Sequence, residues 1–135
     1  MGTDTKPLIV NGQIRDCKEF NGTIEVGDNV TFGGYVIIAK GREGQTKIGN
    51  NVSIGNFANI GHNVTIGDNV EIGAGVIICG HAVIEDNCKI KVGVIIRNRV
   101  KISKGITVGQ GSNVVKDLTL INTTYIGNPA DQIIC

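Results

Sequence analysis

Residues 48–83 read IGNNVS IGNFAN IGHNVT IGDNVE IGAGVI ICGHAV, which is a run of six units of six residues each. Every unit begins with isoleucine, and its fifth residue is valine or alanine. The same phase continues towards the C-terminus, where all fourteen first positions from Ile48 to Ile126 are Ile, Val or Leu. Self-similarity at a fixed period indicates a repeat architecture.

The residue content favours strands over helices. The 135 residues include 22 Ile and 15 Val but only 3 Leu, and amphipathic helices do not show that ratio of β-branched residues to leucine. Gly and Pro together number 22, below the roughly one quarter of residues at which low-complexity disorder is expected. The length corresponds to one domain.

The hexad phase also extends towards the N-terminus, through Leu8, Ile14, Phe20, Val26, Phe32 and Ile38. Ten residues then separate Ile38 from Ile48, which is one hexad plus four extra residues. We therefore expect a single β-helix domain over residues 1–135. Its expected parts are an N-terminal cap at 1–7, a protruding loop at 39–47, and a C-terminal coil and tail at 120–135.

Each hexad is expected to form a short strand followed by a corner. The fifth position and the next first position are two residues apart, so their side chains point to the same side of a strand, towards the core. The fourth position tolerates a positive φ in ten of the twelve hexads that begin between Ile48 and Val114, as a tight corner requires. Three hexads close a triangle, which predicts an all-β, single-stranded parallel β-helix of six to seven triangular coils.

Residues eighteen apart become neighbours along the axis of such a coil, about 4.8 Å from each other. His62 then lies next to Gly80, and His81 lies on the same edge. Ile77 and Ile95 point outward beside that edge, which indicates a subunit contact or a ligand groove. The alternative is that they are ordinary surface residues of a strand.

The net charge of +1 gives the chain no general attraction for nucleic acid or for an anionic membrane, and no apolar run is long enough to cross a bilayer. We expect a soluble protein without either partner. One window of sixteen residues holds six basic residues and no acid, which predicts a phosphate-binding patch or a solvated face. These residues are Lys89, Lys91, Arg97, Arg99, Lys101 and Lys104.

The hexads have the form [LIV]-G-x-x-[VA]-x and resemble those of the hexapeptide-repeat acyltransferases. That resemblance implies a left-handed coil and a homotrimer. The segment NIGHNVTIGDNVEIGAGVIICGHAVIEDN, residues 59–87, resembles the active-site stretch of the sugar and sugar-nucleotide N- and O-acyltransferases in particular. By this resemblance His62 is the catalytic base, and the backbone N–H of Gly80 donates to the thioester oxygen.

The chemistry of the residues agrees with these roles. Acyl transfer from a thioester requires a base with a pKa near neutrality, and histidine is the usual one. The reaction also requires a donor aimed at the developing oxyanion, which an exposed glycine N–H can supply. The next residue, Asn63, stands where several of these families have an acid, and it can orient the imidazole. The resemblance further implies that His81 contacts the acceptor or its phosphate.

Two further segments bear on the substrates. The predicted loop AKGREGQTK, residues 39–47, carries Arg42 and could cover the site or be a tolerated surface insertion. The tail YIGNPADQII resembles the closing segment of acetyl-CoA-dependent members, which implies that Asn128 and Pro129 lie near the adenine of the cofactor. The expected donor is therefore acetyl-CoA, with Arg97, Arg99, Lys101 and Lys104 on its phosphates. The expected acceptor is a sugar-like small molecule.

Several alternatives remain at this point. The donor could be an acyl carrier protein, or the chain could be a catalytically silent scaffold or a ligand-binding trimer. A zinc site of the γ-carbonic anhydrase type needs three histidines and the chain has two, so we expect no metal. No secretory signal precedes the repeat, and the four cysteines lack CxxC spacing. We therefore expect free thiols in the cytoplasm.

Overall fold

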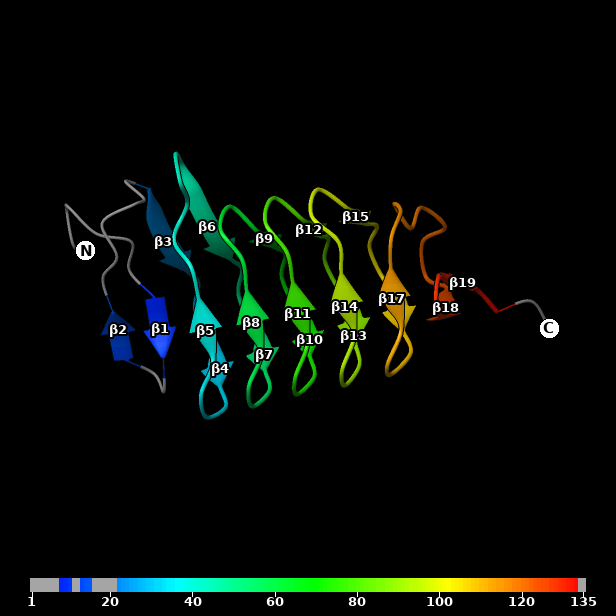
Figure 1. Cartoon of the computed structure of the whole chain (residues 1–135), viewed down its shortest axis with the longest axis horizontal. Coiled ribbons are helices and arrows are strands. Elements are labelled where there is room, and N and C mark those ends of the chain that lie inside the picture. The colour runs from blue at the N-terminus through cyan, green and yellow to red at the C-terminus, as the bar shows by residue number, and fades with distance from the viewer. Residues whose placement is uncertain (1–7, 11–12, 16–21, 134–135) are drawn as a thin grey trace.

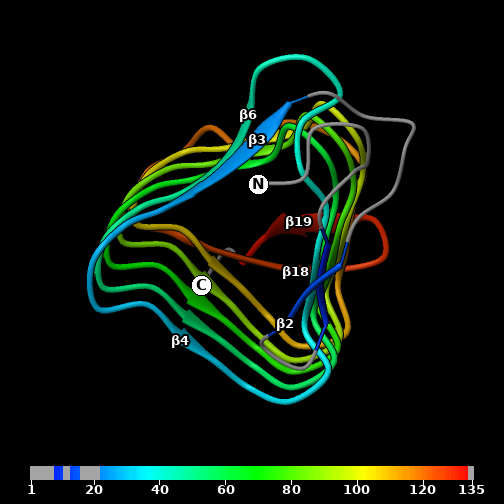
Figure 2. The same cartoon turned by 90° about the vertical axis from the view of Figure 1, so that its left-hand side faces the viewer.

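The computed structural model describes residues 8–10, 13–15 and 22–133. The predicted cap at 1–7 and the residues Cys17, Phe20 and Cys135 lie outside this range. Within it the chain forms short strands joined by corners, wound into successive coils (Figure 1) with a triangular cross-section (Figure 2). The described residues include no helix, and hence none that is long and apolar enough to cross a membrane.

Three parallel sheets form the sides of the prism. Face 1 consists of β3 (Thr23–Val26), β6 (Gln45–Ile48), β9 (Thr65–Ile66), β12 (Val83–Ile84) and β15 (Lys101–Ile102). Face 2 consists of β4 (Thr31–Phe32), β7 (Ser53–Ile54), β10 (Glu71–Ile72), β13 (Lys89–Ile90), β16 (Thr107–Val108), β18 (Thr124–Gly127) and the antiparallel β19 (Ala130–Gln132). Face 3 consists of β5 (Ile37–Ile38), β8 (Asn59–Ile60), β11 (Ile77–Ile78), β14 (Ile95–Ile96) and β17 (Asn113–Val114).

Strand pairing confirms the eighteen-residue circuit. Ile77 pairs with Ile95 on face 3, and Glu71 pairs with Lys89 on face 2. Between β3 and β6 the spacing is larger, because Thr23 pairs with Gln45. That spacing of 22 residues accommodates the four extra residues of the sequence.

The coil is left-handed. Figure 2 views it from the N-terminal end, and in this view the chain passes from β3 to β4 and on to β5 anticlockwise while it runs away from the viewer. A path that recedes while turning anticlockwise describes a left-handed helix. Parallel strands joined through a crossover in one sheet are usually connected in the right-handed sense. This coil therefore departs from that rule, as the family resemblance implied.

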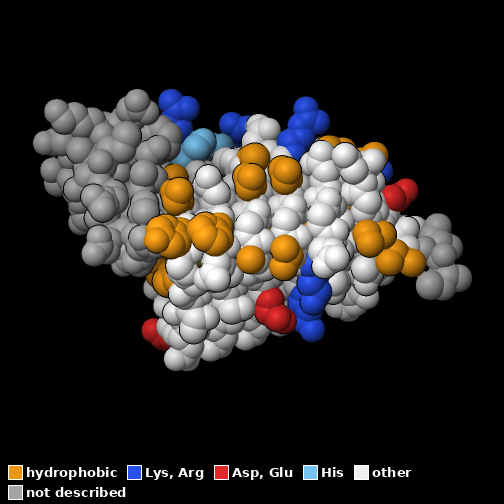
Figure 3. Space-filling view, turned by 60° about the horizontal axis from the view of Figure 1, so that its bottom comes forward, with side chains coloured by type: hydrophobic (Ala, Val, Ile, Leu, Met, Phe, Trp, Pro, Cys, Tyr) orange, Lys and Arg blue, Asp and Glu red, His pale blue; other side chains and the backbone are white. Residues whose placement is uncertain are grey.

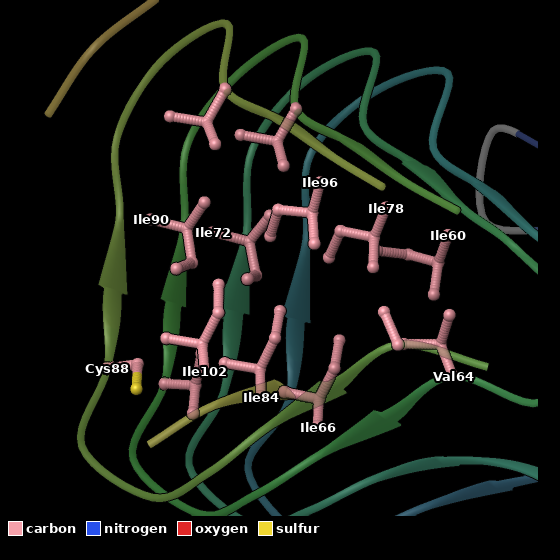
Figure 4. Close-up of a cluster of buried hydrophobic side chains, with 14 of the residues drawn as sticks. Ile60, Val64, Ile66, Ile72, Ile78, Ile84, Cys88, Ile90, Ile96 and Ile102 are labelled. Atoms are coloured by element: carbon pink, nitrogen blue, oxygen red, sulfur yellow. The ribbon is translucent and has the colours of Figure 1, made fainter. Parts of the chain in front are cut away.

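The core consists of side-chain ladders that run along the axis. Ile60, Ile78 and Ile96 stack on the inner side of face 3, as Figure 4 shows, and each is at most 1% exposed. Similar ladders line the other two faces. Burying one such side chain contributes about 1.5–3 kcal/mol, so these ladders supply most of the drive for folding.

The corners adopt the backbone conformation that the fourth positions predict. Every fourth position from Asn51 to Gly111 has a positive φ. Phe57 and Arg99, at φ values of 63° and 64°, adopt it although their side chains do not favour it. The coil geometry therefore overrides residue preference at these two positions.

The predicted hexad phase is wrong at the N-terminal end. β1 (Leu8–Val10) and β2 (Gln13–Arg15) form an antiparallel pair in which Leu8 faces Arg15, so Leu8 and Ile14 do not continue the coil. The dipeptide Asn11-Gly12 between the two strands is a strong sequence signal for a two-residue hairpin loop. A hairpin returns the chain on itself and cannot advance the coil.

The phase is also wrong at the C-terminal end. Leu120 and Ile126, which were predicted to point inward, are 50% and 47% exposed. Thr107 pairs with Thr124, a spacing of seventeen residues, so the frame slips by one and Tyr125 becomes a core residue. The last coil then closes with the antiparallel β18–β19 pair.

The loop at 39–47 leaves the coil over fewer residues than predicted. β6 already begins at Gln45, and Ala39 and Lys40 are buried. Residues 39–44 lie between β5 and β6, and we call residues 41–44 the insert loop.

Two of the four cysteines lie in the described part of the chain, and both are free thiols. Cys88 is fully buried, and burial raises the pKa of its thiol to about 11. Its Sγ donates to the carbonyl of Ser103 at 3.1 Å. We therefore expect Cys88 to remain protonated in the folded protein.

The inward ladders predict that substitutions at neighbouring positions of one strand differ sharply in their effect on the free energy of unfolding. Ile84 is fully buried, whereas the preceding Val83 points outward. Ile84→Ala should lower the free energy of unfolding by about 2–5 kcal/mol, because it leaves a cavity between two coils. Val83→Ala is the matched control and should cost about 1 kcal/mol or less. Urea denaturation followed by circular dichroism measures both, and equal losses would contradict the inward assignment.

Candidate functional site

The predicted stacking of His62 and Gly80 is confirmed. His62 follows β8 and Gly80 follows β11, at the corner where the chain leaves face 3 for face 1. The N–H of His81 donates to the carbonyl of His62 at 2.9 Å, and the N–H of Gly61 donates to the carbonyl of Ile78 at 2.7 Å. These bonds place residue 80 one coil beyond residue 62 on the same edge, which we call the histidine edge.

The imidazole of His62 lies against the Cα of Gly80. A Cβ atom at position 80 would be only 2.6 Å from Nε2 of His62, so a side chain there would displace the ring. Within the described residues the N–H of Gly80 makes no hydrogen bond. The edge therefore presents Nε2 of His62 beside an available backbone donor.

The other ring nitrogen of His62 is held by its neighbour. Nδ1 lies 3.1 Å from Oδ1 of Asn63. The amide of Asn63 also contacts the insert loop, accepting from the N–H of Arg42 at 2.9 Å and donating to the carbonyl of Glu43 at 2.6 Å. The structure thus brings Asn63 and the backbone of Arg42 to the histidine edge.

Sequence reasoning did not find Thr46, which supports this arrangement. Thr46 is fully buried, and its Oγ1 accepts from the N–H of Asn63 at 2.8 Å. The same hydroxyl donates to the carbonyl of Ala39 at 2.6 Å. The only available signal in the sequence was a polar residue at an inward-facing position, two residues after the insert loop.

His81 packs edge-on against His62, with ring centroids 5.0 Å apart and an interplanar angle of 88°. Desolvation lowers the pKa of His81 below its ordinary value of 6.5, and repulsion from Arg99, His62 and Arg42 lowers it further. The folded state thus favours neutral His81. The associated stability is present above pH 6.5 and is lost as the pH falls through the lowered pKa.

The predicted basic patch is not a single patch. Sixteen residues span almost a whole coil, so the side chains are distributed around the prism. Lys89 lies on face 2 beside Glu71 at 3.8 Å, and Lys101 lies on face 1 beside Glu85 at 3.5 Å. Arg97 and Arg99 flank the histidine edge after β14, whereas Lys91 and Lys104 lie at the other two corners.

The residues Asn128 and Pro129 lie in the turn between β18 and β19, joined by a cis peptide bond. Oδ1 of Asn128 accepts from Nδ2 of Asn113, which stands on β17 at the C-terminal end of face 3. The structure therefore places these two residues at the end of face 3, while Arg97 and Arg99 lie along its histidine edge.

Among the described residues, the outward strand positions of face 3 hold no charged side chain. The outward positions of its five strands are Ile37, Asn59, Ile77, Ile95 and Asn113. Figure 3 shows apolar side chains gathered over this region.

The apolar surface continues onto the next corner. Tyr35 and Phe57 stack there with ring centroids 5.4 Å apart, and both rings are more than half exposed. Face 1 and face 2, by contrast, carry Glu and Lys on their outer sides. Face 3 is thus the side of the prism that is suited to contact another surface.

Two hollows lie on the described part of the chain, away from the histidine edge. One hollow of about 520 Å³ is lined by Glu25, Lys47, Asn50 and Asp68, among others. Another of about 420 Å³ lies between Thr65, Glu85 and Lys104. Neither includes His62 or Gly80. In the described part of the chain no group of three or more His, Cys, Asp or Glu side chains is arranged to hold a metal ion.

Comparison with known proteins agrees with this architecture. Residues 45–80 match the family model described as bacterial transferase hexapeptide (six repeats). Over 97 residues, which are 72% of this chain and 28% of the relative, the sequence is 33% identical to UDP-3-O-acylglucosamine N-acyltransferase of Shewanella denitrificans. The chain spans about a third of the length of the curated relatives it matches.

Solved structures share the fold. UDP-N-acetylglucosamine acyltransferase of Francisella novicida matches with a TM-score of 0.74 and 23% identity, over 83% of this chain and 41% of that one. The acetyltransferase domain of PglB from Neisseria gonorrhoeae, solved with acetyl coenzyme A, matches with a TM-score of 0.62 and 19% identity, over 83% and 54%.

The triangular coil and its repeat define a left-handed β-helix of hexapeptide units. The chain carries the repeat of the bacterial transferase hexapeptide family and is similar to sugar-nucleotide acyltransferases.

The environment of His81 predicts its titration. Its Cε1–H resonance should titrate with a midpoint below 6.5, because desolvation and the nearby cations disfavour the imidazolium. Arg99→Ala should raise the midpoint towards 6.5, since one of the repelling charges is removed. Arg97→Ala is the control and should leave it unchanged. NMR titration of the folded protein measures all three, and a wild-type midpoint above 6.5 would refute the assignment.

Proposed function

We propose that the chain is the β-helical part of an acetyltransferase that moves an acetyl group from acetyl-CoA to an amine or hydroxyl of a sugar-like acceptor. The observation that carries this proposal is the contact between Nε2 of His62 and Gly80, where a side chain would collide with the ring. Similarity to sugar-nucleotide acyltransferases supports it. The similar fold of the PglB domain, solved with acetyl coenzyme A, supports acetyl-CoA as the proposed donor.

The proposed reaction uses the two groups in sequence. Nε2 of His62 takes the proton from the acceptor amine or hydroxyl as its nitrogen or oxygen attacks the thioester carbonyl. The N–H of Gly80 donates to the oxyanion that forms. When the tetrahedral intermediate collapses, the carbon–sulfur bond breaks, and the imidazolium returns its proton to the departing thiolate. No step requires a metal ion.

The remaining site residues divide between the two substrates in this proposal. His81 and Arg42, on the acceptor side, lie near each other at the N-terminal part of the histidine edge. Arg97 and Arg99 flank the path to the C-terminal end, where Asn128 and Pro129 would lie near the adenine. Lys101 lies on face 1 and Lys104 at the corner between face 1 and face 2. In this proposal they would approach the phosphates of the donor from the side away from face 3. Acetyl-CoA as donor also fits the expected cytoplasmic location.

We further propose that the active form is a homotrimer in which face 3 packs against a neighbouring subunit. A small-molecule site normally requires a concave pocket, and neither of the two hollows described above includes His62 or Gly80. The uncharged outer surface of face 3 borders that edge. A second copy placed there would supply the missing wall and enclose His62.

The catalytic roles lead to a direct test. Acetyl-CoA should raise the melting temperature of wild-type protein, and His62→Ala should keep that shift while lowering acetyl transfer about 10²–10⁴-fold. Gly80→Ala should lower transfer at least 10²-fold because its methyl group displaces the ring. Asn69→Gly, a substitution at another corner, is the control.

A coupled thiol-release assay with amino-sugar and hydroxyl-sugar acceptors gives the rates. If acetyl-CoA and other thioesters give no melting shift, the scaffold alternative replaces the enzymatic one. Activity with an acyl carrier protein thioester but not with acetyl-CoA would identify the other donor. Full activity in His62→Ala would remove that residue from the mechanism.

The molar mass of the protein in solution tests the proposed trimer interface. Ile77→Lys combined with Ile95→Lys should convert a trimer to monomers, because burying two ammonium groups without partners is costly. Glu71→Lys on face 2 is the matched charge change and should leave the trimer intact. Light scattering after size-exclusion chromatography measures the mass, and a monomeric wild type at micromolar concentration would exclude the trimer.

A further inference from the structure

The insert loop, residues 41–44, is tied to the coil on both sides. On one side the N–H of Gly22 donates to the carbonyl of Gly41, and the N–H of Thr23 donates to that of Gly44, both at 2.9 Å. The two carbonyls converge so closely that a Cβ at position 22 would lie 2.3 Å and 2.4 Å from their oxygens. The loop is therefore a compact turn whose own backbone is fixed.

On the other side the backbone of the loop hydrogen-bonds to the side-chain amide of Asn63. Its N–H at Arg42 donates to Oδ1 of Asn63, and its carbonyl at Glu43 accepts from Nδ2 of the same side chain. One backbone donor and one backbone acceptor therefore face the amide. If the amide were flipped, two donors would meet on one side and two acceptors on the other. The loop thus allows a single orientation of Asn63.

That orientation has a consequence for His62. The atom 3.1 Å from Nδ1 of His62 is Oδ1 of Asn63, and a carbonyl oxygen can only accept. Nδ1 must therefore carry the ring proton. A neutral imidazole has one proton on its two nitrogens, so Nε2, the nitrogen against Gly80, holds the lone pair.

We propose that the insert loop is a positioning element that sets the tautomer of His62 through the amide of Asn63. The backbone of the loop performs this role, so the side chains of Arg42 and Glu43 are not required for it. A carboxylate would accept from Nδ1 whichever way it was turned. An amide does so only when its orientation is fixed, and the loop supplies that constraint. The catalytic importance of this tautomer rests on the proposed function.

The tautomer can be read directly, without any substrate. Protein labelled with ¹⁵N-histidine gives ring nitrogen shifts that separate protonated from unprotonated nitrogens above the pKa of the ring. Wild type should show a protonated Nδ1 and an unprotonated Nε2 at His62. Deletion of residues 41–44 restores the eighteen-residue spacing between β3 and β6, and it should leave His62 as a mixture with a substantial Nε2–H population.

Point variants separate the backbone of the loop from its side chains. Arg42→Pro removes the N–H that donates to Oδ1 and should produce a similar mixture of tautomers. Arg42→Ala keeps the N–H and should retain the wild-type state. Asn63→Ala should lose the preference, and Asn63→Asp should restore it. Circular dichroism confirms folding, and if the deletion does not fold, Arg42→Pro decides.

The outcomes separate this inference from the proposed function. An Nε2–H tautomer in wild type would overturn it, as would a wild-type tautomer ratio in Arg42→Pro or in the folded deletion variant. A loop-dependent Nδ1–H tautomer in a protein without acetyl transfer would support the inference and count against the proposed function. If transfer does occur, its rate in the deletion variant should fall at least in proportion to the lost Nδ1–H fraction.

Discussion

Each strand of the coil, from β3 to β18, finds its parallel hydrogen-bond partners one circuit away, and that constraint determines the rest of the structure. A strand of two residues has almost no stability alone. Here it is paired on both edges, as when Glu71 pairs with Ser53 on one side and Lys89 on the other. Within the repeat the circuit must remain at eighteen residues for the isoleucine ladders to stay in register. Its length changes only at the insert loop and in the last coil.

The same constraint gives the histidine edge its geometry. Because successive corners stack along the axis, the imidazole ring of His62 on one coil contacts the backbone of Gly80 on the next coil. His62 and Gly80 are brought together without a loop of their own, at corners joined by backbone hydrogen bonds. The insertion between β5 and β6 adds a loop at this edge. Its backbone is hydrogen-bonded to Gly22 and Asn63, so it is held against the coil.

How far the sequence predicts this molecule depends on whether the repeat extends to the region in question. The inward ladders and the stacking of residues 62 and 80 followed from period alone, because the period fixes neighbours in space. The hairpin at β1–β2 and the slip that buries Tyr125 lie where the repeat ends, and a hydrophobic residue in the correct phase was misleading there. The prediction of a single basic patch was wrong for another reason. Residues that are close in sequence need not be close in space on a coil that completes a turn in eighteen residues. The hydrogen bonds between the insert loop and Asn63 are made by backbone atoms of the loop, so no particular residue type in the loop predicts them.

The antiparallel return of β19 against β18 has a consequence at the end of the prism. A parallel coil that simply stopped would offer a row of unpaired backbone groups at the spacing of another coil, and a second molecule could continue it as a fibre. Here the last parallel strand is already paired, with Tyr125 and Ala130 buried beneath the return. As Figure 2 shows, the pair lies across the far end of the triangle. The antiparallel strand β19 thereby covers the open edge of face 2, whereas β15 and β17 are the last strands of faces 1 and 3.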